Sequence, residues 1–289
     1  MNGTEKPAGP GVSGKSGDSA QGDLAHGGLG CLLIHGYGGS PFEMEGLAAA
    51  LEEVGFAANL TCLPGHGEGF ADFGAFRFGD WLAHAETELK TMLARYARVA
   101  VIGFSMGGTI ALNLAARYPV AGVVCISTPV HVLSLWPWPL ENCKFYARTA
   151  VSQIRTLLAP FLPHKTTEAG EAGETSRDIA PWQGFSGPLN IPQLVSMREG
   201  CAQTRHLLPR LAAPLLIMQD ERDRLVNPDN AWAIARLAAS GDTSVILTRM
   251  RENVTRHHML PTHRETAALA AASIVRFCRE KTLDRQQSL

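Results

Sequence analysis

Six short apolar segments alternate with helical patterns along this chain, and the alternation restricts its fold more than any other feature does. The segments are apolar throughout rather than at every second residue, as expected of strands covered on both faces of a sheet. Strands that alternate with helices form mostly parallel sheets, so we predict an α/β fold with a doubly wound sheet. The six segments are GCLLIH (30–35), FAANLTCL (56–63), RVAVIG (98–103), VAGVVCIS (120–127), PLLIMQ (214–219) and SVILT (244–248).

Length and composition allow this fold to form a single domain with a large core. The chain has 289 residues, of which 45% are hydrophobic and 18% charged, a profile far from that of a disordered protein. Residues 1–28 are rich in Gly and Ser, which predicts a flexible tail followed by a folded domain at 29–285. No buried strand pattern occurs between about 129 and 210, and we predict a helical cap insertion there.

Charge and cysteine content limit the classes of partner. Lys and Arg number 26 and Asp and Glu 27, so the summed charge does not attract nucleic acid or an anionic membrane. We expect a small-molecule substrate, no nucleic acid, no stable membrane insertion, and a monomer or weak homodimer.

Cys31, Cys62 and Cys125 lie in strand segments, where thiols act as small apolar residues. Residues 1–28 also lack the apolar core of a signal peptide, which favours a reducing, cytoplasmic location.

Three patterns predict helix starts between the strands. The tetrapeptides SPFE (40–43) and THRE (262–265) have the spacing of a capping box, in which a hydroxyl and a carboxylate each accept a backbone amide of the first turn. Asn227 precedes a proline, and Asn is a favoured N-cap residue. We therefore predict helices that begin close to these three positions.

The stretch GFSMG (103–107) matches the pattern G-x-S-x-G between a predicted strand and an amphipathic helical pattern. A sharp turn from strand to helix leaves no room for Cβ atoms around its central residue, which explains why Gly103, Gly107 and Gly108 surround Ser105. The pattern predicts that Ser105 is exposed at the tip of the turn as a nucleophile. A purely structural glycine turn is the alternative interpretation.

A serine hydroxyl becomes nucleophilic when a histidine removes its proton and an acid orients that histidine. In this architecture the order along the chain is Ser, acid, His, with each residue just beyond a strand end. We predict Asp223 as the acid, because Asp220 lies too close to the preceding strand end to reach far.

Two adjacent histidines follow the last predicted strand. We predict His257 as the general base, and we expect His258 to point elsewhere if His257 faces the site. One alternative is that both are histidines of a solvated loop. Another is a zinc site that includes His263, but no cysteine or carboxylate completes a clear ligand set.

Backbone amides must stabilise the negative charge that develops on a substrate carbonyl oxygen. The amide of Met106 follows the nucleophile at a helix N-terminus and is one predicted donor. The second should lie in the loop HGYGG (35–39) after the first strand, where we predict the amide of Tyr37. A plain turn between strand and helix is the alternative for this loop.

The ordered motifs of the chain resemble the α/β-hydrolase superfamily, in particular microbial carboxylesterases and monoacylglycerol-lipase-like serine esterases. The resemblance runs from Leu29 to about Lys281 and implies a Ser-His-Asp triad with no cofactor and no metal. Three positions depart from the family pattern. Arg222 stands where a histidine is usual, His258 stands where an apolar residue usually follows the catalytic histidine, and Thr262 stands where the helix after the histidine usually begins with an Asp. The motifs are LLIHGYGGSP (32–41), LPGHGE (63–68), GDWLAH (79–84), GFSMGG (103–108), QDERDRLVNP (219–228) and VTRHHM (254–259).

These features predict a serine hydrolase that cleaves carboxylic esters of short to medium acyl chains, as a carboxylesterase or monoacylglycerol lipase does, through an acyl-enzyme. Trp136, Trp138 and Phe145 of the predicted cap would bind the acyl chain, or they pack the cap onto the sheet. An acyltransferase or thioesterase would use the same triad, and a catalytically inactive binding protein is a third possibility. Dehalogenase or epoxide-hydrolase chemistry would require a carboxylate at position 105.

Overall fold

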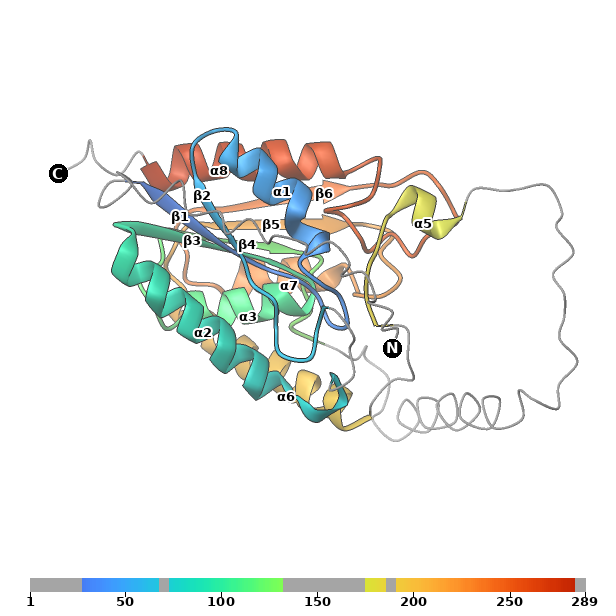
Figure 1. Ribbon diagram of the computed structural model, residues 1–289, viewed down its shortest axis with the longest axis horizontal. Coiled ribbons are helices and arrows are strands. Elements are labelled where there is room, and N and C mark those ends of the chain that lie inside the picture. The colour runs from blue at the N-terminus through green and yellow to red at the C-terminus, as the bar shows by residue number, and fades with distance from the viewer. Residues whose placement is uncertain (1–27, 68–72, 132–174, 186–190, 284–289) are drawn as a thin grey trace, which may run out of the picture.

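The six predicted strands form one parallel sheet in the order β2-β1-β3-β4-β5-β6, which confirms the doubly wound α/β fold (Figure 1). The structure is a computed structural model that describes residues 28–67, 73–131, 175–185 and 191–283. The strand order reverses at β1 and β3, and parallel sheets bind ligands at such a switch point, beyond the carboxyl ends of their strands. The strands are β1 (Leu29–Ile34), β2 (Ala57–Leu60), β3 (Arg98–Phe104), β4 (Gly122–Ile126), β5 (Leu215–Asp220) and β6 (Thr243–Thr248).

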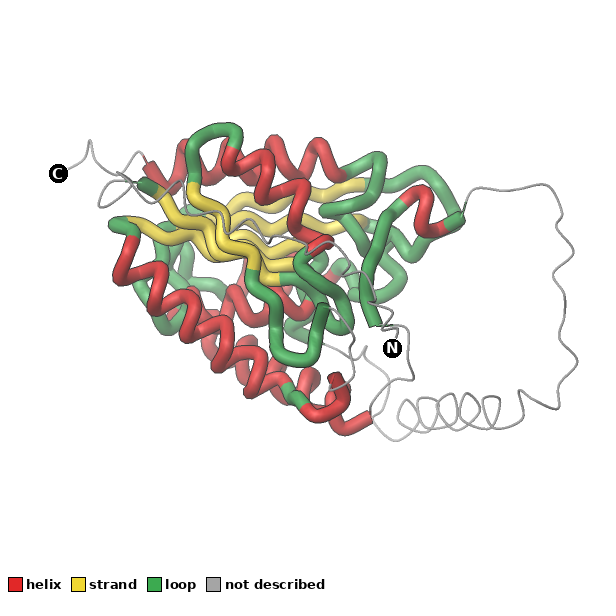
Figure 2. The backbone as a smooth tube through the Cα atoms, viewed as in Figure 1, coloured by secondary structure: helices red, strands yellow, loops and turns green. Residues whose placement is uncertain are grey.

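Helices cover both faces of the sheet and bury an apolar layer on each (Figures 1 and 2). Successive strand residues point to opposite faces, so Leu32 and Ile34 pack against α2 and α3 while Cys31 and Leu33 pack against α1 and α8. This explains why the strand segments are apolar throughout. The helices are α1 (Phe42–Glu52), α2 (Phe78–Arg95), α3 (Met106–Ala115), α5 (Ser176–Ile179), α6 (Ile191–Leu207), α7 (Asp229–Leu237) and α8 (Ala267–Leu283), with short 3₁₀ turns at Phe73–Ala75 and Leu208–Arg210.

The two predicted capping boxes are wrong. Helix α1 begins at Phe42 with no side-chain cap, because the carboxylate of Glu43 is turned toward the amide of Gly36. Helix α8 begins only at Ala267, and Glu265 instead accepts the amide of Arg251.

The first and third predicted helix starts are close to the observed ones, since α1 begins at Phe42. Helix α7 begins at Asp229, and the side-chain oxygen of Asn227 accepts the amide of Asp229 at 2.9 Å.

Between β4 and β5 the described residues form helices α5 and α6 and contain no strand. Helix α6 packs against α2 and α3. Trp136, Trp138 and Phe145 lie outside the described residues, as does the predicted tail up to residue 27. The assignment of 129–210 as a cap therefore stays a prediction.

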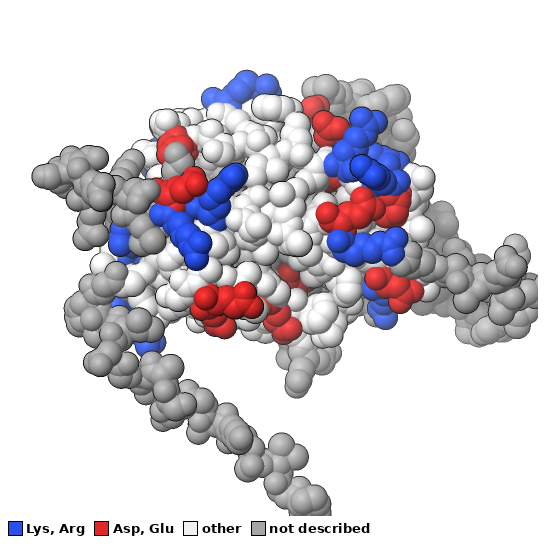
Figure 3. All heavy atoms as spheres, turned by 90° about the horizontal axis from the view of Figure 1, so that it is seen from above, with Lys and Arg blue, Asp and Glu red and all other residues white. Residues whose placement is uncertain are grey.

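Charged side chains of both signs lie next to one another on the face shown in Figure 3, rather than in one patch of a single sign. This mixture agrees with the formal net charge of −1. Among the helices that the structure describes, none combines the length and the apolar character needed to cross a bilayer.

Candidate active site

Ser105 lies at a sharp turn between β3 and α3, in a backbone conformation that residues other than glycine rarely adopt. Its φ is 53° and its ψ is −120°, and its amide donates to the carbonyl of Ile126 at 2.8 Å. A Cβ atom at Gly103 would overlap the backbone of Gly107, and one at Gly107 would overlap the carbonyl of Ile34. The turn closes only because these positions are glycine, and the strain it stores is typical of functional sites.

The side chain of His258 lies between Ser105 and Asp223. Its Nε2 is 3.0 Å from Ser105 Oγ, and its Nδ1 is 2.8 Å from Asp223 Oδ2. The three residues follow β3, β5 and β6, so they come from the carboxyl ends of three strands of one sheet. This arrangement allows His258 to accept the serine proton while Asp223 fixes the orientation of its ring.

The carboxylate of Asp223 is held by hydrogen bonds on both oxygens. Oδ2 also accepts the side-chain amide of Gln219 at 3.0 Å, and Oδ1 accepts the backbone amides of Leu225 and Val226 at 2.8 and 2.9 Å. Together with His258, these donors fix the carboxylate in one orientation.

Asp220, the other candidate acid, has a different role. Its carboxylate accepts the hydroxyl of Thr248 and the amide of Met250, both at 2.8 Å, and the amide of Arg222 at 2.9 Å. Asp220 therefore joins the end of β5 to the residues that end and follow β6.

The structure corrects the predicted base, because His257 faces away from Ser105. His257 is fully buried, its φ is 57°, and its Nε2 lies 2.6 Å from the carbonyl oxygen and 3.1 Å from Oε1 of Glu252. These contacts join its ring to Glu252, whereas the ring of His258 contacts Ser105. The family pattern contained a signal for this choice: Met259, an apolar residue, follows His258, whereas His258 itself follows His257.

Glu252 is the centre of a second polar cluster, separate from the contacts of Ser105. Its carboxylate contacts His257, Nε2 of His263 at 3.2 Å, and the hydroxyl of Thr255. Burial acts to raise the pKa of Glu252, but the hydrogen bonds from Thr255, Val254 and His263 outweigh it and lower the pKa to about 2. Of the three histidines considered for a zinc site, His257 and His263 contact Glu252, and His258 contacts Ser105.

The loop at residues 35–39, here called the oxyanion loop, packs directly against the nucleophile. A Cβ atom at Gly36 would lie 3.3 Å from Ser105 Cβ. The amide of Gly36 donates to Glu43 Oε2 at 2.9 Å, and the amide of Gly38 donates to His66 Nε2 at 3.1 Å. Within the described residues, no hydrogen bond occupies the amide of Tyr37. The predicted oxyanion donor is therefore an amide of this loop to which no described residue bonds.

The second predicted donor, the amide of Met106, is the first of helix α3. The first amides of a helix have no partner within the helix, and no other acceptor contacts this one in the part of the chain that the structure describes. Helix α3 lies close to the oxyanion loop, because a Cβ atom at Gly107 would contact the carbonyl of His35.

Two buried histidines support the oxyanion loop as neutral rings. Burial lowers the pKa of His35 to about 3 and that of His66 to about 4, with the neighbouring His66 adding to the effect at His35. His35 Nδ1 donates to the carbonyl of Gly36 at 2.9 Å, and its Nε2 accepts the amide of Leu63 at 3.1 Å. His66 contacts the carbonyl of Pro64 through Nδ1, which leaves Nε2 as the acceptor for the loop.

Glu43 should make the stability of the fold depend on pH. Burial raises the pKa of Glu43 from 4.5 to about 7, in spite of opposing hydrogen bonds from Gly36 and Trp182. A carboxyl with a raised folded-state pKa contributes stability that is fully present below the unfolded pKa and is lost as pH rises to the folded pKa. At about 1.4 kcal/mol per pKa unit, the loss between these values is about 3 kcal/mol. Glu43→Gln should remove this pH-dependent loss of stability. The free energy of unfolding of the variant, relative to that of wild type, should therefore rise by about 3 kcal/mol between about pH 4 and pH 8.

Urea denaturation of both proteins at the two pH values measures this difference. Glu45→Gln is the matched control, since Glu45 is exposed on the same helix. A stability difference between Glu43→Gln and wild type that is the same at both pH values would contradict the expectation.

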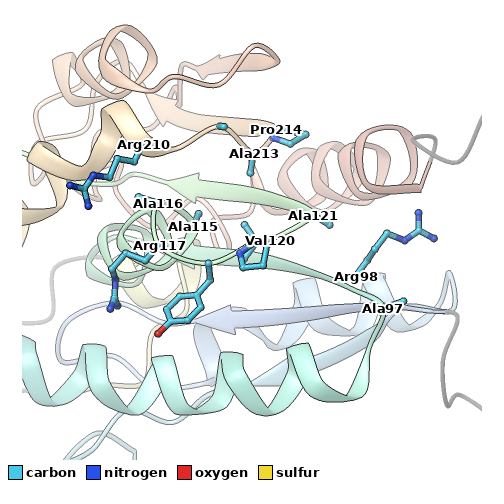
Figure 4. A pocket seen from close by; sticks show the side chains of 13 residues that line it. Ala97, Arg98, Ala115, Ala116, Arg117, Val120, Ala121, Arg210, Ala213 and Pro214 are labelled. Atoms are coloured by element: carbon cyan, nitrogen blue, oxygen red, sulfur yellow. The ribbon is translucent and has the colours of Figure 1, made fainter. Parts of the chain in front are cut away.

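A cavity of about 510 Å³ lies at the amino ends of strands β3, β4 and β5 (Figure 4). Its lining includes Arg98 and Pro214, which stand at the amino ends of β3 and β5, and Arg210. Because Ser105 and His258 follow the carboxyl ends of strands, this cavity is separate from the candidate active site.

The fold and the constellation at Ser105 define a serine hydrolase of the α/β-hydrolase type. The chain belongs to the family described as Serine aminopeptidase, S33 (Hydrolase_4), whose model matches residues 30–251. Ser105 and Asp223 lie inside the matched residues, and His258 follows them.

Characterised relatives cover most of the chain. A thermostable monoacylglycerol lipase of Bacillus sp. (strain H-257) is 27% identical over 227 residues, which are 78% of this chain and 82% of the relative. A pimeloyl-[acyl-carrier protein] methyl ester esterase of Stenotrophomonas maltophilia (strain R551-3) is 29% identical over 225 residues, 74% of this chain and 83% of the relative. A carboxylesterase of Bacillus subtilis (strain 168) is 21% identical over 201 residues, 69% of this chain and 74% of the relative.

Solved structures share the fold. A structure of the metagenome-derived lipolytic enzymes LipS and LipT superposes with a TM-score of 0.67 at 23% identity, covering 88% of this chain and 95% of the other. The monoacylglycerol lipase of Paleococcus ferrophilus superposes with a TM-score of 0.60 at 17% identity, covering 86% of this chain and 93% of the other.

Proposed function

We propose that this protein hydrolyses carboxylic esters of short to medium acyl chains, as a carboxylesterase or a monoacylglycerol lipase does. The observation that carries the proposal is the placement of His258, 3.0 Å from Ser105 Oγ and 2.8 Å from Asp223 Oδ2. The names of the relatives support an ester as the substrate: monoacylglycerol lipase, methyl ester esterase and carboxylesterase.

In the acylation step, Ser105 Oγ attacks the ester carbonyl carbon while His258 Nε2 takes the hydroxyl proton. The amides of Tyr37 and Met106 stabilise the oxyanion of the tetrahedral intermediate, and Asp223 stabilises the protonated ring. The intermediate collapses when His258 gives the proton to the leaving alcohol, which leaves an acyl group on Ser105.

In the deacylation step, His258 takes a proton from water, and the resulting hydroxide adds to the acyl carbon. The second tetrahedral intermediate then releases the carboxylic acid as the proton returns to Ser105 Oγ. If an alcohol or amine replaces water, the same site acts as an acyltransferase, and if the leaving group is a thiol it acts as a thioesterase. Trp136, Trp138 and Phe145 remain proposed residues of the acyl pocket.

Purified protein should hydrolyse p-nitrophenyl esters, because the proposed triad and oxyanion hole act on the carbonyl and not on the leaving group. We expect the highest kcat/KM at a short or medium acyl chain. We would measure acetate through palmitate together with a monoacylglycerol, an acyl-coenzyme A and an aminoacyl p-nitroanilide. The nitroanilide is included because the family is described as a serine aminopeptidase. Turnover of the thioester or the anilide alone would replace the proposed function, and turnover of none would overturn it.

A further inference from the structure

Glu43 is a buried carboxyl group that the proposed chemistry does not use. Only 2% of its surface is exposed, and within the described residues it forms no ion pair. Burying such a group without a charged partner is unfavourable unless hydrogen bonds satisfy it. The amide of Gly36 donates to it at 2.9 Å, and hydrogen bonding from the Trp182 side chain acts with this bond to lower the pKa against the effect of burial.

Trp182 belongs to a segment that joins the region between β4 and β5 to the oxyanion loop. In this segment, residues 181–185, the amide of Phe185 donates to the carbonyl of Gly38 at 2.6 Å. Helix α6 adds a third contact, since Gln193 accepts the hydroxyl of Tyr37 at 3.0 Å. The oxyanion loop is therefore held by residues that are distant in the sequence, and Trp182 reaches it through Glu43.

These contacts determine the direction of the Tyr37 amide. In a trans peptide the C=O and N–H groups point in opposite directions. The carbonyl of Gly36 accepts His35 Nδ1 at 2.9 Å and the amide of Gly39 at 3.2 Å, so it points into the loop and the Tyr37 N–H points out of it. Glu43 fixes the preceding peptide plane through the Gly36 N–H, and rotation of that plane would turn the next one.

We propose that Glu43 is a positioning residue of the oxyanion hole. This inference rests on the proposed function, because it assigns to Glu43 the alignment of a donor for the ester oxyanion. Glu43 does not touch the substrate. Its effect is transmitted through Gly36 to the amide of Tyr37.

Kinetics of Glu43→Gln, Glu43→Ala and Trp182→Phe test the proposal. Glu43→Gln keeps one acceptor oxygen and replaces the other with an NH2 group, which cannot accept a hydrogen bond. Glu43→Ala removes both acceptor oxygens. Trp182→Phe removes only the indole N–H. Loss of one oxyanion donor costs about 10²- to 10³-fold in kcat, so we expect misalignment to cost about 10- to 100-fold in Glu43→Ala. Smaller losses are expected in the other two variants, with KM changed by less than about threefold.

An alkyl trifluoromethyl ketone provides a second readout. Ser105 Oγ adds to its carbonyl carbon and His258 takes the proton, which gives a tetrahedral adduct with its oxyanion in the hole. We expect the inhibition constant to rise in parallel with the loss of kcat/KM. Combining Trp182→Phe with Glu43→Gln should cost less than the product of the two separate losses, because both act on one carboxylate.

Glu45→Gln on the same helix should match wild type. A purely structural role would leave kcat and ketone affinity within about twofold of wild type in the folded variants, and that result would overturn the inference while the proposed function stands. If wild type itself neither hydrolyses esters nor binds the ketone, the proposed function fails and the inference fails with it. Trp182→Phe keeps an aromatic ring at a partly exposed position, so it tests the proposal even if Glu43→Ala does not fold.

Discussion

Replacement of Ser105 by Ala should reduce kcat for a p-nitrophenyl ester by about 10⁴-fold or more, while KM changes little. The hydroxyl is the atom that bonds to the acyl carbon, so its removal eliminates the acyl-enzyme route and leaves only what substrate binding and the oxyanion hole provide. The protein should remain folded, because the turn is held by the backbone bond from Ser105 to Ile126 and by the glycines around it. Steady-state kinetics and a thermal melt of both proteins measure the two quantities.

Ser176→Ala is the matched control, because Ser176 is exposed at the start of helix α5. It should retain wild-type kinetics. If Ser105→Ala kept more than about a tenth of wild-type kcat, ester cleavage would proceed without a Ser105 acyl-enzyme, and the proposed mechanism would be wrong.

The sheet was predictable because buried parallel strands leave a local record in the sequence. The inner strands β1, β3, β4 and β5 pack helices on both faces and are almost continuously apolar, whereas the edge strands β2 and β6 are partly exposed; all six predicted segments are strands. The sharp turn at Ser105 was predictable for a related reason, since the glycines around it are required by contacts within a few residues and with the adjacent strands. Local geometry of this kind can be read from residue type and spacing.

Side-chain contacts within irregular loops could not be predicted in this way. The tetrapeptide at 40–43 has the residues of a capping box, yet Glu43 accepts the amide of Gly36 instead of capping its own helix. The choice between His257 and His258 depended on Glu252, because a buried partner for His257 is what leaves His258 to face Ser105. Residue type alone does not distinguish two adjacent histidines, and the sequence signal for the choice was the apolar Met259 that follows His258.

Substituting the two histidines separately should therefore give opposite results. We expect His258→Asn to lower kcat by about 10⁴-fold, because the hydroxyl of Ser105 loses the group that removes its proton. We expect His257→Asn to keep kcat within about tenfold of wild type and to lower the melting temperature, since it removes a buried ring that contacts Glu252. Asn is the appropriate replacement because it tolerates the left-handed backbone of His257, at a φ of 57°.

Steady-state turnover of the variants separates the two roles. Wild type and His257→Asn should both turn over the ester, and His258→Asn should not, because only His258 lies within hydrogen-bond distance of Ser105 Oγ among the described histidines. A large loss of kcat in His257→Asn with His258→Asn near wild type would exchange the two assignments. Because Asp223 contacts His258, Asp223→Asn should resemble His258→Asn in kcat, which ties the result to the triad rather than to the loop that carries both histidines.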